Sequence, residues 1–464
     1  MQTQHLAALA LGLVVHQAVF IRGEWHIKAP AIISVHATLL VALCALETVL
    51  ARDGRPGVPT TSLISSSLYL LALLSSITTY RLFFHRLHHF PGPRLVTASK
   101  LWHVWKCRSS RSYQVLDDWH HKYGTFVRTG PSEITIFHPK AYDALDGPRT
   151  RSPRSDWYDI IADFGQLKRR EWLDGALFMR SAVGLLGPFS PAIWIPKIAF
   201  AFFPGAWRVK HWFLMVDFAE KCTDVRMKNN PKEPDIVSGF INDFNASAQG
   251  DYDRRTLKGD AAALVITGSD TISPSLTILL HFLATHPSHA SRIRAELSAV
   301  PDISDARALA LLPHLTGTIN ESMRLLPAVP TFGTRMTPPE GLTFEGTFIP
   351  GGVKICSSRY TLGRLEAAFE QPLEFIPERW STRPELIKDK RAFAPFGSGR
   401  TSCVGKQLAM IQLRLVTASL LTKYHIRFSS PDVAGLVERD MKDQLTAKPG
   451  VLSLVFEKLG DVVA

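Results

Sequence analysis

The sequence predicts a mainly α-helical globular domain with small β-sheets, preceded by membrane-spanning helices. Two observations lead to this fold class. Residues 1–87 contain three apolar segments, and the remainder alternates helical patterns with short β-rich stretches bounded by Gly and Pro. The 464 residues are 46% hydrophobic and 20% charged. That composition excludes a disordered or collagen-like chain and allows a core large enough to bury a cofactor.

The three apolar segments are residues 6–21, 29–50 and 63–80. A spanning helix needs about 20 apolar residues, so the second and third segments are long enough and the first is short. The chain begins MQTQH, without the positive charge that opens a cleaved signal peptide, which favours retained anchors. The alternative is that the three segments are core helices of a soluble domain.

Charge predicts which side of the membrane the remainder occupies. Arg81 and Arg86 follow the third segment, and the whole chain has a net charge of +12. Because Lys and Arg accumulate on the cytosolic side, we expect the large remainder in the cytosol. The density of Pro and Gly at 88–94 predicts a stiff turn, which we interpret as a hinge between the anchor and the globular domain. We therefore divide the chain into a membrane anchor at 1–87 and a globular domain at 88–464.

The positive charge is spread along the chain without a long run of like charges. A soluble nucleic-acid-binding protein is therefore the least favoured class, whereas a basic surface suits an acidic protein partner. The five cysteines are an odd number and contain no CxxC pair, which argues against a disulfide framework or a zinc ribbon.

One cysteine, Cys403, lies where a Gly-rich loop enters a predicted helix. Backbone N–H groups and the helix dipole at such a place stabilise a thiolate. Glycines also let the backbone approach a flat ligand, and an arginine can pair with a carboxylate. The loop has the sequence FGSGRTSCVG and contains Phe396, Gly399, Arg400, Cys403 and Gly405.

Two further motifs precede this loop. Glu321 and Arg324 are three residues apart on a predicted helix, so they share a face and can pair. The segment TGSDT, with Asp270 and Thr271, lies in a long predicted helix that also contains Pro274. Pro274 removes the N–H that would bond the carbonyl of Asp270, so we expect a local kink.

The three motifs resemble those of the cytochromes P450. The loop around Cys403 resembles the haem-binding loop. The segments ESMR at 321–324 and PERW at 377–380 resemble the ExxR and PERF segments of the family. The resemblance implies that Cys403 is the axial ligand of a haem b iron, with Phe396, Gly399, Arg400 and Gly405 around the cofactor. It implies a structural network of Glu321, Arg324 and Arg379, and proton delivery by Asp270 and Thr271.

What the resemblance implies for function is a membrane-bound haem-thiolate monooxygenase of the fungal type. Such an enzyme uses dioxygen and electrons from NADPH, delivered by NADPH-cytochrome P450 reductase, to hydroxylate or otherwise oxidise a hydrophobic small molecule. The expected setting is fungal secondary metabolism, with the anchor in the lipid of the endoplasmic reticulum membrane and the haem domain in the cytosol. No nucleic acid is expected as a partner.

The sequence also departs from the family pattern. Thr401 stands where the family usually places its loop arginine, and Arg400 lies one position earlier. The early tryptophans lack the arginine four residues later that contacts the haem carboxylates in many relatives. The chain is too short for the usual helices in this region, so we infer that residues are missing between about 149 and 163. The alternative function is a non-catalytic or haem-deficient remnant. Cys356 is the next candidate for the haem ligand.

Overall fold

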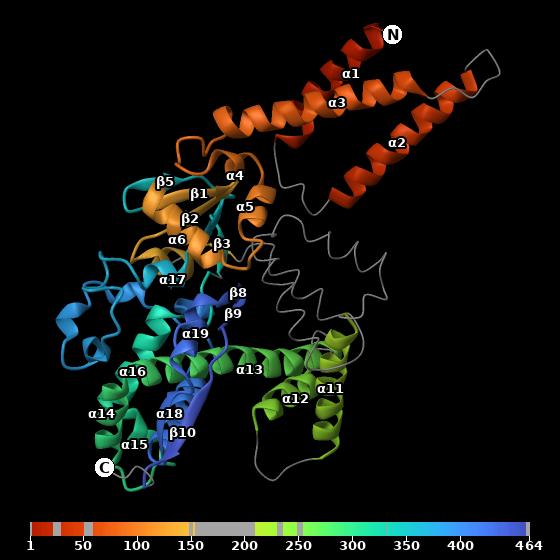
Figure 1. Ribbon diagram of the computed structural model, residues 1–464. Coiled ribbons are helices and arrows are strands. Elements are labelled where there is room, and N and C mark those ends of the chain that lie inside the picture. Colours follow the sequence, from red (N-terminus) through yellow and green to blue (C-terminus); the bar gives the residue numbers. More distant parts are fainter. Residues whose placement is uncertain are drawn as a thin grey trace. The chain divides into compact units, whose positions relative to one another are not determined.

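The computed structural model describes residues 2–21, 29–50, 59–147, 152–153, 209–229, 235–247, 254–331 and 333–460. Figure 1 shows its helices and strands, coloured along the chain. The contacts between residues divide the chain into two units. The first contains Met1–His103 and Arg128–Ser132, and the second contains most of the remainder. Helices predominate in the described residues and the sheets are small, which confirms the predicted fold class.

The first unit begins with three long helices. They are α1 (Gln2–Val15), which continues as η1 (His16–Phe20), α2 (Ala29–Leu50), and α3 (Thr60–Thr79), which continues as η2 (Tyr80–Phe84). All three are long and apolar enough to cross a membrane. Their large apolar side chains are exposed, as at Leu6 (65%) and Val41 (68%). A soluble core would cover these side chains, so the arrangement favours membrane helices over core helices.

Polar side chains within these helices have partners on a neighbouring helix. His36 Nε2 lies 2.9 Å from the hydroxyl of Tyr69. The carboxylate of Glu47 accepts hydrogen bonds from the backbone N–H groups of Thr61, at 3.0 Å, and Ser62, at 2.7 Å. Lipid supplies no hydrogen bonds, so polar groups in a membrane need partners of this kind. His36 and Glu47, which interrupt the apolar pattern of residues 29–50, therefore fit a bundle of membrane helices.

The Pro-rich hinge is followed by α4 (Arg94–Ala98) and α5 (Lys100–Lys106). The backbone N–H of Arg128 donates to the carbonyl of Pro91 at 2.7 Å, and its side chain donates to the carbonyl of Arg81 at 3.0 Å. The first bond joins the Pro-rich stretch, and the second joins the end of η2, to a strand more than thirty residues further along the chain. The boundary between anchor and globular domain at residue 87 stays a prediction.

The largest sheet of the described residues has the strand order β1-β2-β6-β3. Strand β2 runs parallel to β6, with Ile134 opposite Ile355, and β3 is antiparallel to β6. Strands β1 and β2, which follow each other closely in the chain, are neighbours in this sheet. The four strands are β1 (Phe126–Gly130), β2 (Glu133–Ile136), β3 (Thr334–Met336) and β6 (Lys354–Cys356). The smaller sheets pair β4 (Leu342–Phe344) with β5 (Thr347–Ile349), β7 (Tyr424–Phe428) with β10 (Leu454–Lys458), and β8 (Lys442–Gln444) with β9 (Thr446–Lys448).

The core of the second unit is helical. Its long central helix, α13 (Arg254–Thr285), packs against α16 (Pro313–Leu325) and α18 (Lys406–Leu421) (Figure 1). Helix α13 is also apolar enough to cross a membrane by composition. Its buried Leu279 and Leu283 instead join a hydrophobic cluster with residues of α14 (Pro287–Leu297), α16 and α18. Protein, and not lipid, therefore covers these apolar side chains.

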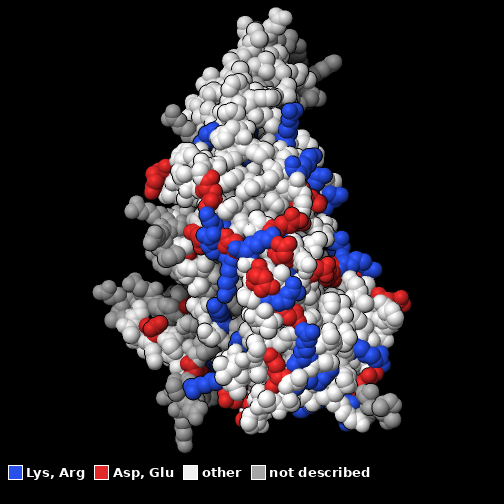
Figure 2. All heavy atoms as spheres, turned by 90° about the vertical axis from the view of Figure 1, so that its left-hand side faces the viewer, with Lys and Arg blue, Asp and Glu red and all other residues white. Residues whose placement is uncertain are grey.

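The other described elements connect or flank this core. They are α6 (Ser112–Tyr123), α7 (Ala141–Asp146), α11 (Val209–Lys228), α12 (Ile236–Ala246), α15 (Ala306–Ala310), α17 (Arg359–Leu362), α19 (Leu436–Arg439), η3 (Pro377–Trp380), η4 (Pro384–Leu386), η5 (Lys390–Ala392), η6 (Gly399–Thr401) and η7 (Pro431–Val433). Charges of both signs are interspersed on the face shown in Figure 2, and no large patch of one sign covers it. This agrees with the dispersed charge of the sequence.

Candidate haem-binding site

The loop around Cys403 folds back on itself immediately before a long helix. The backbone N–H of Cys403 donates to the carbonyl of Phe396 at 2.8 Å, which closes the loop. Helix α18 then begins at Lys406, with Gly405 as its N-cap residue. The sulfur therefore lies near the positive end of a helix dipole.

Cys403 differs from the other cysteines in its surroundings. It is exposed, whereas Cys107 and Cys356 are buried and Cys44 lies in a membrane helix. The sulfur of Cys356 is 3.1 Å from the hydroxyl of Thr135 within the four-stranded sheet. A buried, hydrogen-bonded thiol is closed to a ligand, so the second candidate is disfavoured. Cys222 is exposed on α11, but no glycine-rich loop surrounds it.

Glycine is required within the loop. Gly399 has a φ of +62°, a left-handed conformation, and a Cβ there would collide with the carbonyl of Asp146. At Gly405 a Cβ would lie 3.7 Å from the sulfur of Cys403, so glycine keeps this side of the sulfur open. Phe396 packs against the hydrophobic cluster of α13, α14, α16 and α18. The side chain of Arg400 lies outside the described part of the chain.

A buried ion pair supports the loop from a distant strand. The guanidinium of Arg335, on β3, forms an ion pair with Asp146 at the end of α7. The hydroxyl of Thr401 accepts from Arg335 and donates to Asp146, each at 2.9 Å. Arg335 thus brings a cation to the position where the family pattern usually has its own arginine. Sequence reasoning missed it, because nothing in its local pattern links it to a loop 66 residues later.

The predicted network of Glu321, Arg324 and Arg379 is present and fully buried. Arg324 donates two hydrogen bonds to the Glu321 carboxylate, at 2.8 and 2.9 Å, and Arg379 donates one at 2.8 Å. The indole N–H of Trp380 and the backbone N–H of Ile376 also donate to this carboxylate, each at 2.9 Å. Five donors therefore surround one carboxylate. The sequence predicted two of the donor residues and missed the other two.

The two arginines use their remaining N–H groups on backbone carbonyls. Arg324 donates to the carbonyls of Gly363, Pro372 and Glu374. Arg379 donates to three further carbonyls between residues 370 and 386. Burial lowers the pKa of Arg379, and the charge of Glu321 opposes that shift. The network thus fixes the loop-rich segment that leads to Cys403, which is a structural role.

The motif in α13 lies on a helix rich in hydroxyl side chains. The hydroxyl of Thr271 donates to the carbonyl of Thr267 at 2.7 Å. Gly268, one residue after Thr267, is exposed, and a Cβ added there would meet nothing within 4 Å. Pro274 lies inside the helix, which continues without a break from Arg254 to Thr285. The kink expected near Asp270 stays a prediction.

These features fit a haem. They provide an exposed cysteine sulfur beside a helix N-terminus, a glycine without a side chain next to that sulfur, and an open stretch on α13. Helices α13 and α18 pack against each other, so both features belong to the same unit. Cysteine is the axial ligand in proteins where haem iron activates dioxygen.

Comparison with known proteins agrees with this reading. The family model "Cytochrome P450" matches residues 163–451. The chain is 30% identical to cytochrome P450 monooxygenase notG' of Aspergillus versicolor, over 97% of each chain, and to monooxygenase FCK2 of Fusarium pseudograminearum, over 96% of each. It is also 30% identical to tryprostatin B 6-hydroxylase of Aspergillus fumigatus, over 92% of each. With its motifs in this arrangement, the chain belongs to the cytochrome P450 family of haem-iron monooxygenases.

Proposed function

We propose that this protein is a membrane-anchored haem-thiolate monooxygenase that hydroxylates or otherwise oxidises a hydrophobic small molecule in fungal secondary metabolism. The observation that carries the proposal is the exposed sulfur of Cys403 in a glycine-rich loop just before α18. The relatives are fungal monooxygenases, and two of them are named for the 6-hydroxylation of tryprostatin B. Those names support hydroxylation as the reaction class and leave the substrate of this chain open.

The residues of the loop would hold the cofactor. Cys403 would bind the iron through its sulfur, and the N-terminus of α18 would stabilise the negative charge of that thiolate. Gly399 permits the left-handed turn of the loop, Gly405 keeps a side chain away from the sulfur of Cys403, and Phe396 anchors the loop in the core. Arg400 is the proposed partner of a haem carboxylate. When bound, haem supplies oxidation by dioxygen with two electrons, and one oxygen atom enters the substrate.

Proton delivery is the proposed role of Asp270 and Thr271. The hydroxyl of Thr271 already uses its hydrogen on the carbonyl of Thr267. Its oxygen lone pairs are then oriented to accept a hydrogen bond from a water molecule. The neighbouring Asp270 carboxylate would exchange protons with that water. Gly268 leaves open space on the same helix for the water and the substrate.

Electrons would come from NADPH through NADPH-cytochrome P450 reductase. The proposed location is the endoplasmic reticulum membrane, with the haem domain in the cytosol. Arg81 and Arg86 at the end of the third membrane segment support this orientation. Protease protection of sealed microsomes tests it. Protease added outside should degrade the globular domain, and a protected domain would contradict the orientation.

A haem-deficient remnant is the second candidate, and two observations favour it. The alignment with the Aspergillus versicolor relative extends over 533 positions, whereas this chain has 464 residues. Such an alignment contains positions where this chain has no residue. The family-model match also begins at residue 163, the end of the stretch where we infer a deletion. These observations support a shortened segment between about 149 and 163.

A carbon monoxide difference spectrum of reduced membranes tests the proposal. The parent protein should give the red-shifted maximum of thiolate-bound haem. Cys403→Ser should abolish it and leave the protein in the membrane. Cys356→Ser, which changes a buried thiol in the same way, should keep it. A spectrum that survives in Cys403→Ser would refute the ligand assignment. A parent without the spectrum would establish the haem-deficient candidate.

A further inference from the structure

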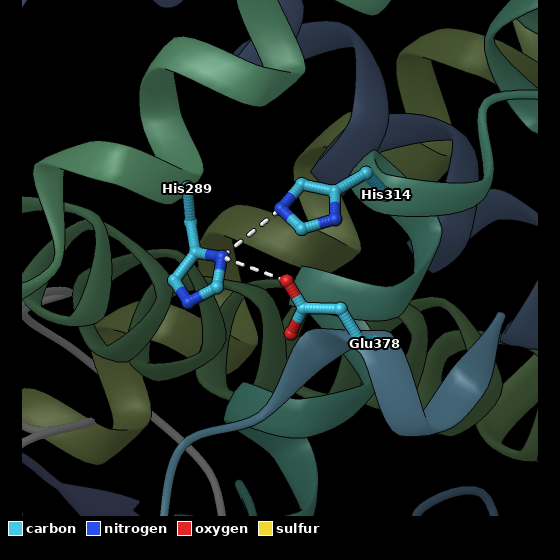
Figure 3. Close-up of side chains that lie close together, drawn as sticks. All are labelled: His289, His314 and Glu378. Carbon is cyan, nitrogen blue, oxygen red and sulfur yellow. Dashed lines mark hydrogen bonds and ion pairs between the residues drawn. The ribbon is translucent and has the colours of Figure 1, made fainter. Parts of the chain in front are cut away.

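Three side chains outside the haem site converge from three different elements. His289 comes from the first turn of α14, His314 from the first turn of α16, and Glu378 from η3 (Figure 3). His289 Nδ1 lies 3.0 Å from His314 Nε2 and 3.8 Å from Glu378 Oε1. All three donor atoms lie within 4.8 Å of one another. The proposed monooxygenase chemistry uses none of these residues.

The spacing of these atoms suits one shared cation. Zinc binds imidazole nitrogen and carboxylate oxygen at about 2.0–2.2 Å, so tetrahedral ligand atoms lie about 3.3–3.5 Å apart. The separations of 3.0 and 3.8 Å around His289 Nδ1 fall on either side of this value. Shifts of a few tenths of an ångström would complete the geometry. A hydrogen bond between the two histidines accounts for the separation of 3.0 Å. The 3.8 Å between His289 Nδ1 and Glu378 Oε1 is too long for a hydrogen bond.

The surroundings favour the protonation states that metal binding needs. His314 is buried, and only 12% of the His289 side chain is exposed. Burial lowers the pKa of both imidazoles, that of His289 to about 4. Their rings are therefore neutral near pH 7 and offer lone pairs. Glu378 supplies a carboxylate that otherwise pairs with the guanidinium of Arg292. The Arg292 side chain is 59% exposed, so it can swing into solvent when a cation enters.

We propose that His289, His314 and Glu378 form a binding site for a divalent transition-metal cation, with zinc as the first candidate. Two histidines and one glutamate are a donor set that zinc uses, and imidazole also suits nickel and copper. Water would occupy the fourth position. The ion would join α14, α16 and η3. Because η3 also supplies Arg379 and Trp380 to the buried Glu321 carboxylate, the ion would reinforce that network.

Zinc content and thermal stability of the full-length protein in detergent test the site. The protein is treated with a chelator, incubated with Zn²⁺ and desalted, and bound zinc is measured by mass spectrometry. The parent should retain one more zinc per chain than His314→Gln, and Zn²⁺ should raise the melting temperature of the parent but not that of His314→Gln. Loss of this ligand should weaken the affinity by more than the roughly 10–100-fold that outer-shell partners contribute. Equal zinc content and affinity in both proteins would overturn the proposal.

Two control variants separate metal binding from general damage to the fold. His286→Gln removes a neighbouring histidine whose ring stacks on Phe375 at 5.1 Å and which lies outside the cluster. It should bind zinc as the parent does, and loss of the ion in this variant as well would count against the site. Arg292→Ala removes the competing guanidinium and should tighten zinc binding, a gain that a misfolded protein cannot give. The carbon monoxide spectrum of each sample reports the haem site separately.

Discussion

Replacement of Glu321 by Gln tests the physical role of the buried network. The carboxylate accepts three hydrogen bonds on one oxygen and two on the other. A glutamine amide keeps one oxygen and places an NH₂ group where the other was, so two or three donors lose their acceptor. Both arginines also lose their counter-charge inside the protein.

The magnitude follows from those lost bonds. A hydrogen bond that involves a charged group contributes about 1.5–3 kcal/mol, so two lost bonds cost about 3–6 kcal/mol. Breaking a buried ion pair by removing one partner costs about 3–5 kcal/mol, which agrees. Because proteins are stable by only about 5–15 kcal/mol, we expect Glu321→Gln to lose most of its folded population on mild heating.

The assay is thermal unfolding of the purified protein, followed by circular dichroism together with the carbon monoxide spectrum. The matched control is Glu374→Gln, the same chemical change in the same region. Glu374 is exposed, and Arg324 uses only its backbone carbonyl. The melting temperature should fall by several degrees in Glu321→Gln and stay unchanged in the control. Equal melting temperatures for the two variants would refute the reasoning.

Three further predictions concern separate parts of the second unit. Thr271→Ala should keep the carbon monoxide spectrum, slow product formation by up to ~10²–10⁴-fold and increase the release of hydrogen peroxide. Product, peroxide and consumed NADPH are measured together, and an unchanged ratio of product to NADPH would exclude a role of Thr271 in proton delivery. Burial raises the pKa of Asp443, so the folded state binds this proton more tightly than the unfolded state and the protein loses stability as pH rises above about 4. Asp443→Asn should remove this loss of stability between pH 5 and pH 8, measured by denaturant titration. The same dependence of stability on pH in parent and variant would contradict the shift. Gly399→Ala should reduce haem incorporation through its left-handed φ and the clash with Asp146, whereas Gly435→Ala, where a Cβ meets nothing within 4 Å, should not; equal incorporation would exclude the steric argument.

The sequence by itself determined the features that depend on local order. The apolar segments, the long helix with Asp270 and Thr271, and the helix after Cys403 each follow from residues adjacent in the chain. The pair of Glu321 and Arg324 is of this kind, because residues three apart on a helix face the same way. Family resemblance then extended that pair to Arg379.

Only the tertiary structure decided which distant residues meet. It brought Arg335 and Asp146 to the loop of Cys403, and it placed Trp380 on Glu321. It also decided the surroundings of two cysteines, which the sequence does not determine. Cys356 is hydrogen-bonded inside a sheet, and Cys403 is exposed. No local pattern encodes such contacts, because the packing of whole elements sets them. The meeting of His289, His314 and Glu378 from three elements has the same origin.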